Sequence, residues 1–204
     1  NCHQAHGLTA DDLIAGDANA RCLECHEGQQ RELEATNVHP PFEEQACLDC
    51  HEPHGSDHPN LARDNRHDLC SGCHDEADDW LTQTSAHMPV KSGDCNSCHE
   101  PHASSRSALL RDDANAMCST CHSALTADET QTVVHGPFGE GSCDTCHQPH
   151  ASTHERLLTQ REDDLCRECH DDVWAEDGAV STHAPFQDGA CTDCHQPHAA
   201  RIAG

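Results

Sequence analysis

The sequence predicts a mainly irregular, small-α fold of short helices and loops, with little or no β structure, arranged in tandem repeats. Large core-forming side chains are scarce: among 204 residues there are three Phe, two Trp and no Tyr, and only 34% are hydrophobic. Cysteine is abundant instead, at 17 residues, which is typical of chains held by disulfides, metals or covalent cofactors. We therefore expect something other than side-chain packing to fill the interior.

The cysteines define a repeat of fixed length. C-x-x-C-H occurs eight times, and the chain opens with Asn1-Cys2-His3, the end of a ninth copy. The motif histidines advance alternately by 23 and 25 residues, so the unit is 48 residues with two motif types, A and B. Type A ends at His26, His74, His122 and His170, and type B ends at His3, His51, His99, His147 and His195. The single elongated array thus divides into a partial repeat, 1–12, and four repeats, 13–60, 61–108, 109–156 and 157–204.

Proline sets the local structure around each B motif. The motif is preceded by H-x-P-[FV]-x4-C, as at His39, and is followed by H-x-P-H, as from His51 to His54. The proline in H-x-P-H forces an extended residue before it and ends any helix there. Segments after the A motifs, such as 27–34 and 75–83, lack an early proline, and we expect two or three helical turns in them.

C-x-x-C-H is the attachment motif of c-type haem, in which two thiols form thioethers with the porphyrin and the histidine binds iron. Two C-x-x-C pairs would complete one zinc site, but they give no reason for a histidine after every pair. A disulfide scaffold fails to explain the histidine for the same reason. We expect eight haems from complete motifs and a ninth at Cys2 and His3. The thioether cysteines are Cys2, Cys22, Cys25, Cys47, Cys50, Cys70, Cys73, Cys95, Cys98, Cys118, Cys121, Cys143, Cys146, Cys166, Cys169, Cys191 and Cys194.

The arrangement L-C-x-x-C-H, a linker, then H-x-P-F-x4-C-x-x-C-H-x-P-H resembles the doubled-CXXCH family of multihaem c-type cytochromes over essentially the whole chain. The resemblance implies electron transfer through bis-histidine haems, outside the cell or in the periplasm. It identifies neither the electron donor nor the acceptor.

Nine further histidines keep the 48-residue register, one for each motif, and are the candidate distal iron ligands. They are His6, His39, His54, His87, His102, His135, His150, His183 and His198. Three others, His58, His67 and His154, fall outside the register, and we expect them at the surface. Methionine occurs only twice, so bis-histidine ligation and low reduction potentials are expected.

Geometry restricts which iron each distal histidine serves. Three residues span at most about 11 Å, too little to pass around a haem, so His54 cannot ligate the haem of His51. In our preferred assignment, His54 binds the haem iron of His74, later in the chain, and His39 binds that of His51. The alternative is that either histidine reaches backward or across a repeat.

The preferred assignment leaves His198 without a haem and the haem of His3 without a distal histidine. A second copy joined head to tail would supply both, and such heterologous contacts propagate into filaments. Alternatively, residues 1–204 are a window of a longer array. No segment resembles a signal peptide, and no apolar run is long enough to span a bilayer.

The expected function is low-potential electron transfer along a closely spaced haem row, as a wire or an extracellular filament subunit. A periplasmic shuttle or capacitor is the main alternative. An enzyme with an open haem iron is the other, although every complete motif ends in His and the distal histidines balance the motifs. The net charge of −26 disfavours nucleic acid and anionic membranes as partners, and it indicates a solvated surface, salt adaptation or a basic partner.

Overall fold

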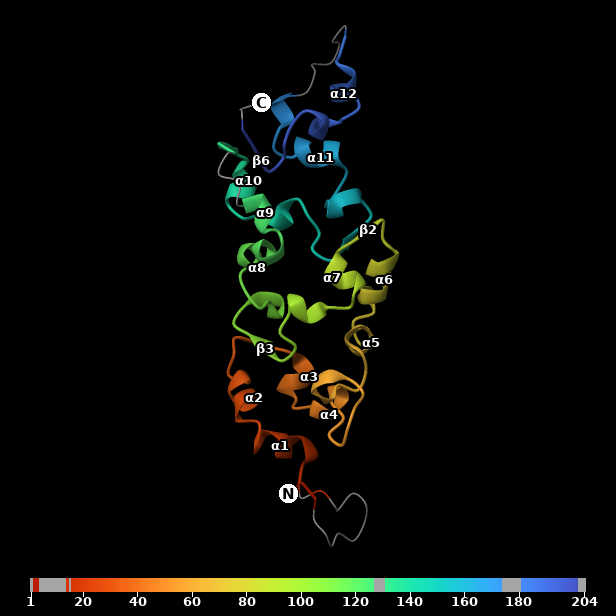
Figure 1. The fold of residues 1–204 in the computed structure, drawn as a ribbon, viewed down its shortest axis with the longest axis vertical. Coiled ribbons are helices and arrows are strands. Elements are labelled where there is room, and N and C mark those ends of the chain that lie inside the picture. The colour runs from red at the N-terminus through yellow and green to blue at the C-terminus, as the bar shows by residue number, and fades with distance from the viewer. Residues whose placement is uncertain (1, 4–13, 15, 127–130, 174–180, 202–204) are drawn as a thin grey trace. The chain divides into compact units, whose positions relative to one another are not determined.

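The computed structural model describes residues 2–3, 14, 16–126, 131–173 and 181–201 and divides into two compact units. Unit 1 comprises residues 1–75 and 93–113, and unit 2 comprises residues 76–92 and 114–204. Both consist of short helices, single helical turns and loops, as Figure 1 shows. The strands have two residues each. The expected fold class is confirmed. The unit boundaries follow neither the 48-residue repeats nor their halves.

Unit 1 contains α1 (Ala18–Leu23), α2 (Glu27–Glu32), β1 (Asn37–Val38), α3 (Pro40–Glu43), α4 (Cys47–Cys50), α5 (Arg66–Ser71) and β3 (Ala103–Ser104), with 3₁₀ turns η2 (Pro59–Leu61), η3 (Cys95–Ser97) and η4 (Ser107–Leu109). Unit 2 contains α6 (Glu76–Thr82), β2 (Ser85–Ala86), α7 (Met88–Lys91), α8 (Ala114–Cys121), α9 (Ser123–Thr126), β4 (Val133–Val134), α10 (Gly136–Gly139), β5 (Ala151–Ser152), α11 (Glu162–Arg167), α12 (Ala184–Gln187) and β6 (Ala199–Ala200). Its 3₁₀ turns are η5 (Cys143–Thr145), η6 (Glu155–Leu157), η7 (Asp171–Val173) and η8 (Cys191–Asp193).

Each H-x-P segment starts a one-turn helix. His39, His87, His135 and His183 have extended backbones and precede α3, α7, α10 and α12, each of which has proline in its first turn. Proline suits this position because its missing N–H would be unpaired there in any case. The histidine is thereby held just outside the helix. The expected helices after the A motifs are also present as α2 and α6.

Short antiparallel pairs join one repeat to the next within each unit. In unit 1, β1 pairs with β3 so that Asn37 lies opposite Ser104, and the amide of His39 then donates to the carbonyl of His102 at 2.8 Å. In unit 2, β2 pairs with β5 and β4 with β6, followed by the equivalent bonds from His87 to His150 and from His135 to His198. The strand before one H-x-P helix thus lies beside the segment after the H-x-P-H of the following repeat.

The chain has almost no side-chain core. Among the described residues, the buried hydrophobic positions are Ala77 and Ala199, the buried polar ones are Ser104 and Ser152, and no large side chain is fully buried. The surface area is 14451 Å², whereas a compact protein of this mass exposes about 9,400 Å². The cysteine side chains are accordingly half-buried or exposed.

The backbone at Gly93 lies close to His67, and a substitution at Gly93 tests this contact. Gly93 has φ of +67°, and a Cβ there would lie 2.8 Å from the Cβ of His67 in the same unit. We expect Gly93→Ala to destabilise the holoprotein by at least about 1–2 kcal/mol, because the left-handed conformation disfavours a side chain and the contact adds to that cost. Chemical denaturation measures the change.

Gly28→Ala is the matched control, because Gly28 lies in α2 and a Cβ added there would have no atom within 4 Å. That variant should be stabilised by about 0.5–1 kcal/mol, the helix preference of Ala over Gly. Equal effects of the two substitutions would contradict the close approach at Gly93.

Candidate functional site

Each C-x-x-C-H motif folds as one helical turn. The amide of the motif histidine donates to the carbonyl of the first cysteine, at 2.9 Å for His26 and at 3.0 Å for His51 and His74. Residues three and four apart share a helix face, so this turn places both sulfurs and the imidazole on one side. A porphyrin attached through two thioethers with its iron bound by the adjacent histidine requires that arrangement.

Three type A motif histidines lie opposite a histidine that precedes an H-x-P helix. The ring centroids are 6.2 Å apart for His39 and His74, with an interplanar angle of 16°. The equivalent pair His87 and His122 has a separation of 6.1 Å. The third pair, His135 and His170, has a separation of 6.0 Å. In each pair the motif histidine comes 35 residues after its partner.

Three type B motif histidines lie opposite an H-x-P-H histidine from the following repeat. The centroid separations are 5.8 Å for His3 and His54, 6.2 Å for His51 and His102, and 6.0 Å for His147 and His198. Here the partner comes 51 residues after the motif histidine. A type A motif histidine therefore faces a partner that comes earlier in the sequence, and a type B motif histidine faces one that comes later.

These separations fit a metal ion between the two rings. Rings in direct contact are closer in the same structure: Trp80 stacks on His150 at 4.2 Å and Phe42 on His102 at 4.6 Å. Metal–imidazole bonds of about 2.0 Å on both sides, with a ring radius of about 1.1 Å from standard bond lengths, place two centroids about 6 Å apart. The donor set and its spacing thus fit haem iron.

The observed pairs differ from the preferred assignment. His39 faces His74 instead of His51, and His54 faces His3 instead of His74. The physical reason is the strand pairing between repeats, because β1 and β3 bring the H-x-P-H segment back to the preceding repeat. The H-x-P-H histidine reaches backward, which is the alternative that the sequence left open.

The remaining candidates are placed as follows. Among the described residues, no second histidine ring lies opposite His26, His183 or His195. His6 lies outside the described residues. The out-of-register histidines His58, His67 and His154 are half-buried, which differs from the expected surface placement.

Backbone carbonyls fix the orientation of the type B motif histidines. The Nδ1 atom of His51 lies 2.9 Å from the carbonyl oxygen of Asn60, and His99 and His147 make the equivalent contact with Ala108 and Arg156 at 2.8 and 3.0 Å. A carbonyl only accepts, so Nδ1 carries the proton and Nε2 keeps the lone pair that binds a metal.

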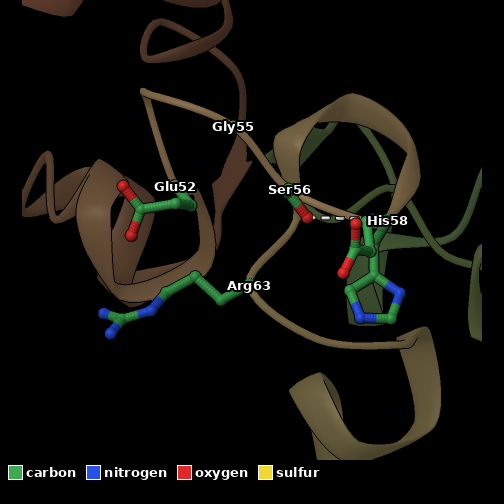
Figure 2. A pocket seen from close by; sticks show the side chains of 6 residues that line it. Glu52, Gly55, Ser56, His58 and Arg63 are labelled. Carbon is green, nitrogen blue, oxygen red and sulfur yellow. Dashed lines mark hydrogen bonds between the residues drawn. The ribbon is translucent and has the colours of Figure 1, made fainter.

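The accepting carbonyls are held by an unusual loop. Asn60 has φ of +58°, a left-handed conformation at a residue other than glycine, and Ala108 and Arg156 share it. The Ser56 hydroxyl accepts from the amide of His58 at 2.9 Å and donates to the Ala62 carbonyl, which closes this loop after His51. Figure 2 shows Ser56 and His58 beside the hollow that this loop borders with Glu52 and Arg63. Sequence reasoning missed these carbonyls, because no residue type marks them.

One candidate distal histidine is oriented by a backbone carbonyl, and two others have a lowered pKa. The Nδ1 atom of His87 lies 3.0 Å from the carbonyl oxygen of Pro149, the proline of an H-x-P-H segment. Burial lowers the pKa of His39 and of His198, with the neighbouring histidines adding to the effect. The neutral imidazole is the form that binds metal.

Successive motifs touch through their cysteines within each unit. The first cysteines of an A motif and the next B motif are hydrogen-bonded, as for Cys70 with Cys95, and this contact lowers the pKa of Cys95 to about 6. Burial, followed by Cys191, raises the pKa of Cys166 to about 11. Haems attached at these cysteines would be close neighbours.

Comparison with known proteins agrees with this geometry. The family described as the doubled CXXCH motif matches residues 1–31, 39–79, 87–127, 135–174 and 183–204. The chain therefore belongs to the doubled-CXXCH family, and it is a multihaem c-type cytochrome with covalently bound haem c. No curated protein matches the sequence. Within the described part of the chain, no helix has the length and apolar character needed to cross a membrane.

Four of the family matches begin at the histidine of H-x-P, at residues 39, 87, 135 and 183. The family's unit therefore starts with a B motif and ends after the next A motif. Our repeats, which start at residue 13, have the same 48-residue period but the opposite order of motifs.

Haem removal should unfold the chain, because the described residues form almost no side-chain core. Protein produced without the haem attachment machinery is expected to give a disordered circular dichroism spectrum and a radius of gyration of about 49 Å by small-angle scattering. A compact apoprotein with a cooperative thermal transition would contradict this expectation.

Proposed function

We propose that the chain carries electrons along a row of low-potential, bis-histidine c-type haems, eight at complete motifs and a ninth at Cys2 and His3. The observation that carries this proposal is the set of six histidine pairs 5.8–6.2 Å apart beside motifs that touch through their cysteines. Haem iron between two imidazoles supplies reversible one-electron transfer at low potential.

The proposed ligand assignment follows the ring pairs. A motif histidine of type A has its distal partner 35 residues earlier, and one of type B has its partner 51 residues later. In the six paired sites both axial positions are then occupied by imidazoles, which leaves no open position for a substrate there, whereas His26 and His195 face no second histidine ring among the described residues. This favours an electron carrier over an enzyme.

The short chain length per haem supports a wire. With about 24 residues for each motif, compact-chain scaling allows a segment only roughly 19 Å across, so neighbouring haems must approach closely. As a wire, the protein would serve extracellular electron transfer, and a filament would form if copies joined head to tail and shared histidine ligands. A periplasmic shuttle or capacitor is the second candidate, because charge storage needs the same haems.

The ligand assignment predicts which iron loses a ligand. His39→Ala should convert one haem from low-spin to high-spin, because its iron keeps only His74, and electron paramagnetic resonance would detect the change. His58→Ala is the control, since His58 is outside the register and should leave the spectrum unchanged.

A variant that lacks one haem shows which iron loses its ligand in His39→Ala. In a variant with Cys70→Ala and Cys73→Ala, which lacks the haem of His74, His39→Ala should create no further high-spin haem. A new high-spin signal there would restore the assignment of His39 to His51. If the deletion variant is not produced, the axial ligands read from an electron microscopy map of the wild-type protein decide the question.

A wire and a capacitor respond differently to one interruption. Removing the haem of His122 by Cys118→Ala and Cys121→Ala should lower the stored charge by one electron, while the conductance of a protein film should fall steeply because the row is broken. Coulometry and conductance are measured on the same film. Unchanged conductance would favour the capacitor, and His154→Ala serves as a control with the row intact.

A further inference from the structure

The distal histidine His102 has a charged partner. Its Nδ1 atom lies 3.2 Å from a carboxylate oxygen of Glu32, the last residue of α2, and both groups belong to unit 1. The Phe42 ring stacks on the same imidazole at 4.6 Å. The two side chains remain 31% and 42% exposed, so the contact lies at the edge of the site.

The equivalent position in the next repeat carries a different side chain. Trp80, 48 residues after Glu32, lies in α6 and stacks on His150 at 4.2 Å with an interplanar angle of 13°. His150 is in turn 48 residues after His102. Two repeats thus place a carboxylate and an uncharged indole against the same distal histidine.

We infer that Glu32 is a positioning residue that lowers the reduction potential of the haem held by His51 and His102. The inference rests on the proposed bis-histidine function. A carboxylate that accepts the Nδ1 proton makes the imidazole a stronger electron donor and stabilises the ferric state. The Trp80 indole packs against its histidine without adding charge. The haems of the row therefore differ in reduction potential, and the haem of His51 is reduced late as electrons enter.

The test is Glu32→Gln, which keeps the side-chain length and removes the charge. In a spectroscopic redox titration of the holoprotein, one haem should shift to a more positive potential while the others stay in place. Glu32→Asp should restore part of the shift, because it keeps the charge. Trp80→Glu should move one other haem in the negative direction.

Glu43→Gln is the matched control, because it removes the same charge from an exposed position on α3 in the same unit. An equal shift from Glu43→Gln, or no shift from Glu32→Gln, would overturn the inference. A variant with Cys47→Ala and Cys50→Ala removes the haem of His51, and Glu32→Gln should then have no effect. A shift that persists there would assign Glu32 to another haem and overturn the inference.

Failure of the proposed ligation is detected separately. His102→Ala should produce one high-spin haem if His102 binds iron. A fully low-spin spectrum of that variant would reject the ligand assignment itself, whereas a high-spin signal together with an unmoved potential in Glu32→Gln would reject only the role of Glu32.

Discussion

The antiparallel contact between a two-residue strand and the following repeat decides which imidazoles can meet. When Asn37 lies opposite Ser104, the backbone bond from His39 to His102 follows directly, and each of these histidines is delivered to a different motif. The contact spans 67 residues and involves few backbone hydrogen bonds, so it is weak by itself. Its stability must come from whatever the imidazoles bind.

The sequence predicted the chemistry of the site better than its connections. The haem attachment motifs and the register of the additional histidines follow from spacing, and the helices after the A motifs follow from the absence of proline. The partner of His39 could not be predicted, because it depends on a strand of two residues that carries no alternating pattern. The carbonyl that orients His51 was also invisible, since Asn60 adopts a left-handed conformation without being glycine.

Similar repeats are not identical in their surroundings. The 48-residue period fixes the backbone, the histidines and the loop closed by Ser56, Ser104 or Ser152, whose hydroxyls bond the equivalent carbonyls. Positions that touch the imidazoles from outside this framework are free to vary, as Glu32 and Trp80 do. The repeat therefore sets the spacing of the sites, while single side chains at its edge give each site its own electrostatic surroundings.

The direction in which each histidine finds its partner also bears on the order of assembly. Under the proposed ligand assignment, a chain exported from its N-terminus presents His39 before His74, so a type A site can be completed as soon as its own motif emerges. His51 emerges 51 residues ahead of His102, and a type B site must wait for the next repeat. A chain that is still being exported would thus end in a type B site that has only its motif histidine. The next repeat to emerge would supply the second histidine.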